Sequence, residues 1–396
     1  MQGSSNAFLT KLSPSGAILF STYWGGNGYD YATGVAVDST GVYITGNTTS
    51  HNFPGQQIVP AYDPYFAHVF VSKFSLTGQE IYSLVLGGSG LNLASAIAVD
   101  SLHQAYIAGV TSSSNFPGVV PMSRYHGGTD AYVAKIDSTG NLIASAYVGG
   151  SGDDRANGIS VDSTGSVYIT GMTQSVDFPH TMPIAMVTAN TFVTKLNSAL
   201  SIDYSNVIGG GDNGGTAIWA DPVHTYVTGI AYQNAYLPTS PGAFQSARPS
   251  PSGVVAFVAE LDSTSGDLMY LSYLGGNDNL TYRVTLATAI AVQGGNVYVA
   301  GNTSSTSFPG APAITPNPTA GWVVKLAPQL NALYYTTFLG ASINGIAVDL
   351  RAPRFPLALR NVEVYTAGYR YTGSINNASL DAFAVKLVEP ANAVFE

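Results

Sequence analysis

Cysteine is absent from this chain of 396 residues, and only 9% of the residues are charged. Without cysteine there are no disulfides and no thiolate metal sites, so packing and hydrogen bonds must stabilise the fold. The formal net charge of −9 argues against a nucleic-acid partner, because such a partner requires a basic stripe. With 45% hydrophobic residues and many Gly, Ser, Thr, Asn and Tyr, the composition is that of an ordered β protein.

Long apolar runs are lacking as well. None approaches the roughly 20 residues that a membrane-spanning helix requires, so we expect no insertion into a membrane. The N-terminus lacks the basic and apolar regions of a signal peptide, which leaves two alternatives: a leader that has been removed, or a cytosolic protein. The low charge, the absence of cysteine and the many Tyr, Asn and Thr residues favour an extracellular or cell-surface protein.

A repeat dominates what is present. Every lysine occupies the same place in one phrase, which reads aromatic, two residues, lysine, and then an aliphatic or aromatic residue. Successive copies lie about 62 residues apart, so one supersecondary unit recurs along the chain. A seventh copy replaces the lysine by Glu260. The six lysines are Lys11, Lys73, Lys135, Lys195, Lys325 and Lys386.

Two further phrases recur in each period. One is a strand of small residues that ends in Asp, as in Val35–Asp38, and the other is Tyr-x-x-Gly, as in Tyr43–Gly46. Between them, turns such as Asp38-Ser-Thr-Gly41 place an Asx side chain and a glycine where a hairpin needs them. After the lysine phrase comes an alternating strand such as residues 18–23, followed by a glycine pair. Each period therefore predicts four antiparallel strands.

Repeating four-stranded antiparallel sheets without helical periodicity predict an all-β fold, a β-propeller in one domain. Six copies of the small-residue strand predict six blades. The last blade would take its outer strand from residues 17–24, so that pairing of the N- and C-terminal strands closes the ring and removes sheet edges. One strand, 8–12 or 383–387, is then surplus; it adds to the closing blade or reaches another molecule. The predicted units are approximately 8–69, 70–131, 132–191, 192–256, 257–321 and 322–382, with 383–387 completing the ring.

The phrases at residues 147–154, 161–171 and 192–196, with Asp177-Phe-Pro179, resemble the SBBP-type β-propeller repeat. The resemblance covers essentially the whole chain. It implies a bacterial or archaeal protein, commonly exported or surface-attached and mostly without a known activity. The family name implies seven blades, so seven is the alternative to the six counted here. The resemblance brings no catalytic residues, and the sixth copy departs from it through an insertion at residues 351–360.

The repeated lysines invite an anion-binding interpretation, but alternation along the strand favours a structural one. Both faces of a blade pack against neighbours, so each lysine stem should lie along an interface with its ammonium reaching an acceptor at the rim. Glu260 would then need a different partner, for which Arg283 is the candidate.

Acids follow the glycine pairs, and residues 149–153 echo the calcium-binding nonapeptide of β-rolls. That motif needs tandem copies nine residues apart, whereas these copies lie about 60 apart. We therefore expect no metal and no cofactor, with calcium as the alternative, and we assign the acids to loop capping and to salt bridges with the strand lysines. The calcium candidates are Asp30, Asp153, Asp154 and Asp278, with Asp212 in a similar place.

The long connections between second and third strands carry the candidate binding residues. Several contain Asn, Asp or Ser followed by Phe-Pro, and histidines lie nearby. A shared binding site is one interpretation; the alternative is a Phe that plugs the blade edge beside a rigid Pro. Trp219 stands in a strand where its counterparts are Ala or Ser, and we expect it to fill or narrow an axial channel. The candidates are His51, Phe53, Phe116, His126, Phe178, His180 and Trp219.

No nucleophile elbow, phosphate loop or histidine-rich metal motif is present, so catalysis finds little support. The sequence therefore predicts a non-enzymatic structural or interaction module. Its partner would be a protein or a glycan, bound through the loops between second and third strands, or another copy of itself, bound through the surplus strand. A site would lie at a position that does not repeat, and Arg248 is one of these. The alternative is a hydrolase or lyase with its site at the mouth of the central channel.

Overall fold

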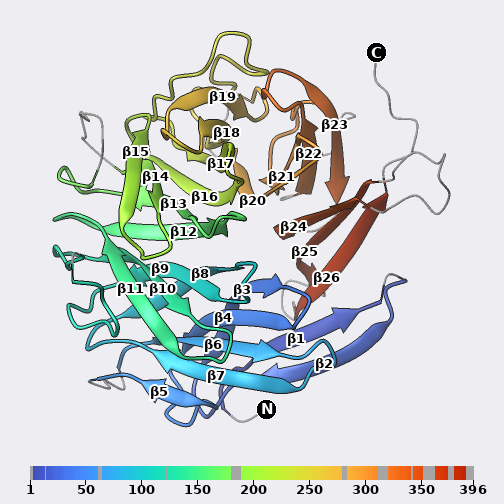
Figure 1. Ribbon diagram of the computed structural model, residues 1–396. Helices are drawn as coiled ribbons and strands as arrows, with labels where there is room; N and C mark the ends of the chain where they lie inside the picture. The colour runs from blue at the N-terminus through green and yellow to red at the C-terminus, as the bar shows by residue number, and fades with distance from the viewer. Residues whose placement is uncertain are drawn as a thin grey trace. The chain divides into compact units, whose positions relative to one another are not determined.

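The computed structural model describes residues 3–13, 15–60, 65–121, 123–179, 189–278, 283–310, 320–339, 342–350, 362–372 and 379–388 (Figure 1). All regular elements in these ranges are β-strands, so the predicted all-β class is confirmed. No described segment forms a helix that is long and apolar enough to cross a membrane. The chain divides into two compact units. One comprises Met1–Met186, Phe192–Val207 and Ala220–Pro222, and the other Val187–Thr191, Ile208–Trp219 and Val223–Glu396.

The first unit contains most of four sheets. A two-stranded sheet pairs β1 (Ala7–Leu12) with β2 (Ile18–Trp24). The next sheet has the order β3 (Asp30–Val37), β4 (Val42–Thr48), β6 (His68–Phe74), β7 (Glu80–Leu86) and β5 (Gln56–Ile58). Then come β8 (Asn92–Val99), β9 (Ala105–Thr111), β10 (Asp130–Ile136) and β11 (Leu142–Val148). The last sheet contains β12 (Asp154–Val161), β13 (Val167–Thr173), β14 (Asn190–Leu196) and β15 (Ile202–Ile208).

The second unit repeats the pattern. Its first sheet contains β16 (Asn213–Ala220), β17 (His224–Ala231), β18 (Val255–Asp262) and β19 (Leu268–Leu274). Its second contains β20 (Thr285–Gln293), β21 (Asn296–Thr303), β22 (Ala320–Leu326) and β23 (Leu333–Leu339). The third consists of β24 (Ser342–Leu350), β25 (Val362–Thr372) and β26 (Ser379–Val388).

These sheets confirm the predicted unit of four antiparallel strands, in the predicted order along the chain. The short β5 is an addition that sequence reasoning missed; it runs parallel to β7 along its outer edge. β2 pairs with β1, with Phe8 opposite Tyr23. The pairing of β2 with residues 383–387 stays a prediction. The single domain and the number of blades stay predictions as well. The insertion at residues 351–360 lies outside the described residues.

Register explains why lysine and tyrosine recur together. In the sheet of β4 and β6, Tyr43 lies directly opposite Lys73, and the ammonium sits 4.7 Å from the centre of the tyrosine ring. The tyrosine hydroxyl donates to Asp38 at the hairpin turn, 2.9 Å away. An Asp–Tyr–Lys arrangement thus uses all three recurring phrases, and the cation–π contact between lysine and tyrosine is present in four of the sheets. The other ammonium-over-ring pairs are Lys135–Tyr106, Lys195–Tyr168 and Lys325–Tyr298, at 5.2, 5.3 and 5.4 Å.

The lysines also reach acceptors, as predicted for a structural role. Lys11 donates to the carbonyl oxygen of Leu76 at 2.8 Å, and Lys135 donates to that of Ser198 at 3.1 Å. These acceptors are carbonyl groups in turns of neighbouring sheets and not the loop acids, so the predicted salt bridges are wrong for these two lysines. The side chain of Lys386 lies outside what is described.

Glu260 also lies opposite a tyrosine, but it contacts the hydroxyl group rather than the ring. It lies opposite Tyr226, whose hydroxyl donates to it at 3.1 Å, and Nε2 of His224 is 3.9 Å away. Arg283, the predicted partner, instead donates to the carbonyl oxygen of Ser304. A carboxylate cannot sit over a ring face as an ammonium does, so this sheet uses the tyrosine hydroxyl instead.

Candidate functional site

Each glycine-pair loop is held by the connection between second and third strands. In the third copy, Oδ1 of Asp177 accepts from the backbone N–H of Ser151 at 2.7 Å, and Oγ of Ser175 accepts from that of Gly152 at 2.7 Å. The residue before Phe-Pro is therefore a latch that closes one loop onto another. The same bonds form between Asn52 and Asn27, Ser50 and Gly28, Asn115 and Ser89, and Ser113 and Gly90.

The phenylalanine after each latch is in the core. Phe53, Phe116 and Phe178 are 3%, 4% and 1% exposed, and each ring packs against the aromatic residue of the lysine phrase. A ring with so little free surface offers nothing to a ligand, which agrees with the plug alternative. The ring pairs are Phe53–Phe70, which is stacked, and the tilted pairs Phe116–Tyr132, Phe178–Phe192 and Phe308–Trp322, with centroids 4.7, 4.6, 4.8 and 5.0 Å apart.

The calcium candidates act as loop caps. Buried Asp30 accepts from the N–H of Gly26 and from the hydroxyls of Thr48 and Ser50. Asp153 accepts from both the N–H and the hydroxyl of Thr129 at 3.0 Å. Within the described ranges, no three His, Asp or Glu side chains converge in a way that could hold a metal ion. The remaining candidates behave similarly: Asp154 accepts from Gly150 and Ser175, and Asp278 from Thr306 and Ser307.

One carboxylate pair was not predicted. Asp130 and Asp154 are both fully or almost fully buried, and both would touch a Cβ placed on Gly149. Asp130 accepts from the N–H of His126 through Oδ2, while its buried Oδ1 has no hydrogen-bond partner. Desolvation, reinforced by the charge of Asp154, raises the pKa of Asp130 to about 7. Burial likewise raises the pKa of Asp154 above its ordinary value.

The other predicted candidates do not come together. His51 is exposed and donates its backbone N–H to Asn27, whereas exposed His126 caps Asp130. Trp219 packs in the core of the second unit, with its ring 6.1 Å from that of Tyr226. His180 lies outside the described residues. The histidines and phenylalanines thus belong to separate copies of one structural loop.

One connection departs from this scheme. Residues 232–254 join β17 to β18, and they form the longest of the five described connections between second and third strands. Leu237 takes the place of the buried phenylalanine: it is 3% exposed and its N–H donates to the Tyr273 hydroxyl, as that of Phe116 does to Tyr147. Tyr236 therefore stands where the other copies have their latch residue. Its backbone pairs with Gly210, and its ring is 73% exposed.

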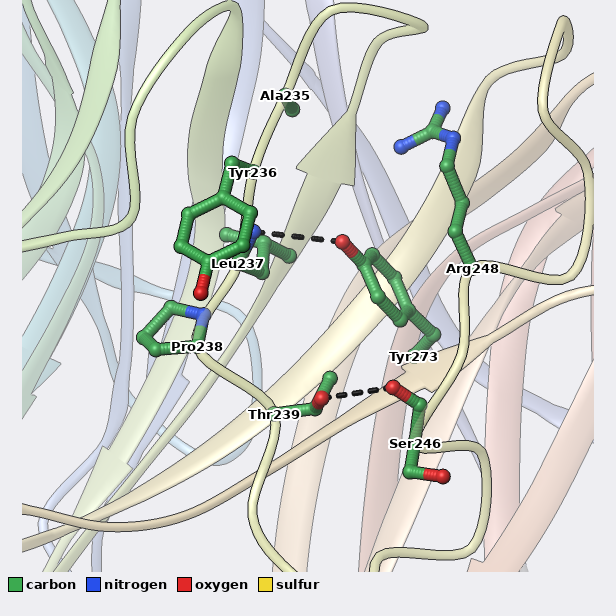
Figure 2. Close-up of a pocket in the computed structure, with 8 residues that line it drawn as sticks. All are labelled: Ala235, Tyr236, Leu237, Pro238, Thr239, Ser246, Arg248 and Tyr273. Carbon is green, nitrogen blue, oxygen red and sulfur yellow. Dashed lines mark hydrogen bonds between the residues drawn. The ribbon is translucent and has the colours of Figure 1, made fainter.

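This connection forms a pocket of about 450 Å³. Figure 2 shows the guanidinium of Arg248 on one side, the ring of Tyr236 on the other and Tyr273 between them. A volume of this size is within the range of small-ligand sites. The lining consists of Ala235, Tyr236, Leu237, Pro238, Thr239, Ser246, Arg248 and Tyr273.

Arg248 holds the base of the connection together. Its Nη2 donates to the carbonyl oxygens of Ala231 at 3.1 Å and Gly253 at 2.7 Å, and its Nε donates to that of Ser250 at 2.9 Å. Nη1 is buried and has no hydrogen-bond partner. Desolvation lowers the pKa of the guanidinium from its ordinary value, and the Tyr273 hydroxyl partly offsets this.

The connection is fixed on the free edge of β19. The N–H of Ser240 donates to the carbonyl oxygen of Leu271, and the N–H of Tyr273 donates to that of Gln245. The Gln245 side chain also makes two bonds to the backbone of Gly275, at 2.9 and 3.0 Å. The pocket is therefore preformed on a sheet rather than carried by a loose loop.

Arg248 was recognised as a non-repeating position, but the pocket around it was not. The available signal is a substitution inside the repeat: where the other copies read Asn, Asp or Ser before Phe-Pro, this copy reads Tyr236-Leu-Pro238. Aligning the copies by their structural role would have marked Tyr236 as a residue whose side chain does not hold the glycine-pair loop, which its backbone holds instead.

Residues 19–54 and 145–179 match the SBBP β-propeller repeat. The first match runs from β2 to the end of the Asn-Phe-Pro phrase, and the second runs from β11 to Asp177-Phe-Pro179. These two segments therefore carry β-propeller repeats of the SBBP type, which confirms the resemblance within them. No curated protein matches the chain.

Several solved structures are similar in fold at low identity. The WD40 domain of Pan2 from Neurospora crassa is 8% identical, with 85% of this chain and 74% of that chain covered and a TM-score of 0.42. BamB from Moraxella catarrhalis is 10% identical, with coverages of 92% and 89% and a TM-score of 0.42. Quinohemoprotein alcohol dehydrogenase from Comamonas testosteroni is 10% identical, with coverages of 92% and 61% and a TM-score of 0.43. Similarities this weak have no bearing on what this chain binds.

Proposed function

We propose that this protein is a non-enzymatic interaction module of the cell exterior, and that the connection 232–254 is its binding element. The observation that carries the proposal is that Tyr236 occupies the position of the polar latch residue of other copies but exposes its side chain beside a preformed pocket. Exposed tyrosines provide large contact areas at low conformational cost, and they are enriched at binding surfaces. The other connections use their polar residues to hold loops, so they have fewer groups left for a partner.

Binding should depend on Tyr236 far more than on a neighbouring tyrosine. We expect Tyr236→Ala to weaken binding to any ligand found on glycan and peptide arrays by about tenfold or more, which corresponds to roughly 1.4 kcal/mol. Tyr232→Ala is the matched control, because Tyr232 is 45% exposed in the same connection but does not line the pocket. It should change affinity less than about twofold. If both variants lose affinity equally, or if neither loses affinity, the binding surface lies elsewhere.

The enzymatic alternative requires acids or histidines that converge in a pocket. The lining described here offers a guanidinium, hydroxyls and aromatic rings, which bind and orient but do not form a general acid–base pair with a carboxylate or imidazole. We propose no cofactor for the same reason. Release of soluble fragments from an array ligand during incubation would favour the hydrolase or lyase alternative.

We further propose that the sheets form the blades of a closed six-bladed ring. In the first unit, Val35 and Val37 of β3 are 60% and 63% exposed, whereas Ile97 and Ile159, the counterparts of Val35, are each 8% exposed. Ile97 is covered because it packs onto Gly34 of the preceding sheet. The sheet that precedes β3 in its unit, β1–β2, has only two strands, which correspond to third and fourth strands. The C-terminal strands would provide the missing first and second strands in a closed ring.

Ring closure can be tested by cross-linking, because the chain has no cysteine of its own. Ala384 occupies the place in its phrase that Leu9 occupies in the first, and Leu9 lies opposite Thr22. We expect Thr22→Cys with Ala384→Cys to form an intramolecular disulfide, measured as faster migration on non-reducing gels. Leu9→Cys with Thr22→Cys is the positive control. Cross-linking of the control without the test pair contradicts closure in the predicted register.

A further inference from the structure

The pocket on connection 232–254 contains a cation without a counter-charge. Arg248 donates to three carbonyl oxygens, which carry no net charge, and its guanidinium carbon lies 6.0 Å from the centre of the Tyr273 ring. No described carboxylate pairs with it. Its Nη1 remains unpaired although it is buried. Leaving a buried charged donor unpaired costs stability, and a guanidinium pairs best with a carboxylate or phosphate. The guanidinium therefore favours an anionic ligand.

Hydroxyl groups also line the pocket, and Figure 2 shows Tyr273 between Arg248 and the pair Thr239 and Ser246. The Tyr273 hydroxyl accepts from the N–H of Leu237 at 3.3 Å, so its own hydrogen is available to a ligand acceptor. Thr239 donates its hydroxyl hydrogen to the carbonyl oxygen of Ser246 at 2.7 Å, which leaves its oxygen as an acceptor. Ser246 is itself exposed. Donors and acceptors thus alternate around the rim, and this arrangement suits a ligand that carries both hydroxyls and an acid.

Aromatic and apolar groups complete the pocket. Tyr236 presents a largely exposed ring at one side, with Pro238 beside it (Figure 2). A flat, partly apolar body stacks on such a ring while its polar edges meet the hydroxyls. A sugar ring has this character, since C–H groups line its faces and hydroxyls line its edge.

An extended peptide is less well suited to this place. Peptides commonly bind by adding a strand to an open sheet edge. Here that edge is already taken, because Ser240 and Gln245 hydrogen-bond with Leu271 and Tyr273 of β19. The main-chain bonds that would supply a peptide's affinity are therefore not available at the pocket.

We infer that the pocket binds an acidic saccharide, with the carboxylate of a uronate residue facing Arg248 and its sugar ring stacked on Tyr236. This inference rests on the proposed function and names its ligand class. Tyr273 would donate to the same carboxylate, and Thr239 and Ser246 would bond to ring hydroxyls.

Titration calorimetry with paired ligands tests the inference without altering the protein. The probes are oligogalacturonates and oligoglucuronates as free acids, the same oligosaccharides as methyl esters, and a short peptide with a free C-terminal carboxylate. We expect the free acids to bind at least about tenfold more tightly than their esters. Because the protein carries a net charge of −9, all titrations belong at 0.1 M salt or above, where long-range repulsion of the acidic probes is screened.

Four variants at two residues show which side chains produce the difference in affinity between acid and ester. Arg248→Gln should abolish the difference between acid and ester, and this ratio stays informative even if the loop loosens and both affinities fall. Tyr236→Phe should keep the difference between acid and ester, whereas Tyr236→Ala should weaken acid and ester alike. Arg248→Lys keeps the charge and should restore part of the difference.

The possible outcomes are distinct. Equal binding of acid and ester overturns the carboxylate assignment, while binding that depends on Tyr236 would still support the proposed function. Binding of the peptide but not of the saccharides overturns the ligand class. The absence of binding by every probe up to millimolar concentration overturns the inference, whereas array ligands lost in Tyr236→Ala would leave the proposed function intact.

Discussion

Replacing Phe178 by alanine should lower the free energy of unfolding by about 3–5 kcal/mol, measured by urea or guanidinium denaturation. Phe178 is 1% exposed, and its ring centroid lies 4.8 Å from that of Phe192. The substitution removes an aromatic ring from a packed core and leaves a cavity between two strands. The backbone bond from the N–H of Phe178 to the carbonyl oxygen of Ser175 is kept by alanine, so the loss of stability reports on the ring alone.

Val176→Ala is the matched control for this prediction. Val176 lies two residues away in the same connection and is 70% exposed, so its truncation should change stability by less than about 0.5 kcal/mol. If Phe178→Ala instead leaves stability unchanged and reduces affinity for an array ligand, Phe178 is a binding residue and the plug interpretation is wrong.

Replacing Asp130 by asparagine should stabilise the protein at pH 8 by about 2–4 kcal/mol and have little effect at pH 4. Asp130 is fully buried beside Asp154, and its pKa is raised to about 7. Asparagine removes one of the two negative charges and supplies a donor toward the other. The first copy of the repeat already has an amide in place of one of the two carboxylates. There, Asn6 and Asp30 lie beside Gly25, in the positions that Asp130 and Asp154 occupy beside Gly149.

The direction in which Asp130 changes folding stability with pH follows from the protons that the folded and unfolded states bind. Between the unfolded pKa of about 4 and the folded pKa of about 7, folded Asp130 holds a proton that the unfolded chain has released. The stabilising contribution of this residue is therefore complete below about pH 4 and is lost as the pH rises to about 7. Carboxylates with lowered pKa values, such as Asp137 at about 2, act in the opposite direction at lower pH. The informative quantity is thus the difference between variant and parent at each pH.

Asp153→Asn provides the control for charge alone. Asp153 is exposed, and it accepts from Thr129 through one oxygen that an amide would retain. Its substitution should leave the pH dependence of unfolding unchanged between pH 4 and 8. A parent protein whose stability does not fall across that range, or an Asp130→Asn variant with the same slope as the parent, contradicts the raised pKa.

The local sheets were predictable because their determinants lie within one period of sequence. The turn from Asp38 to Gly41 carries its own caps, with Oδ1 of Asp38 accepting from the N–H groups of Thr40 and Gly41. The alternation of side chains along each strand then predicts which residues lie on the same face of the sheet. Because the pattern recurs in every copy, a strand that is ambiguous in one copy is identified from the others. The same local logic identified the structural role of the lysines, although it did not reveal the tyrosine ring under the ammonium of four of them.

The candidate site was less predictable because its residues are exceptions to the repeat. Tyr236 and Tyr273 are separated in sequence, and only pairing of the connection with β19 brings them to one pocket. The Asp130–Asp154 pair has the same origin, since each residue begins a strand in a different sheet. Sequence reasoning weighed the acids by their spacing along the chain, and that spacing does not show which of them share a buried space.

The connections between second and third strands have a consequence for behaviour at high concentration. They lie along fourth strands: β5 runs beside β7, Val119 bridges to Ser145, and Ser240 bonds to Leu271. Part of the outer edge of each of these sheets is thus already occupied, which hinders near-identical segments from stacking into cross-β fibrils through it. A protein built from many similar strands can in this way remain dispersed at high concentration without relying on a high surface charge.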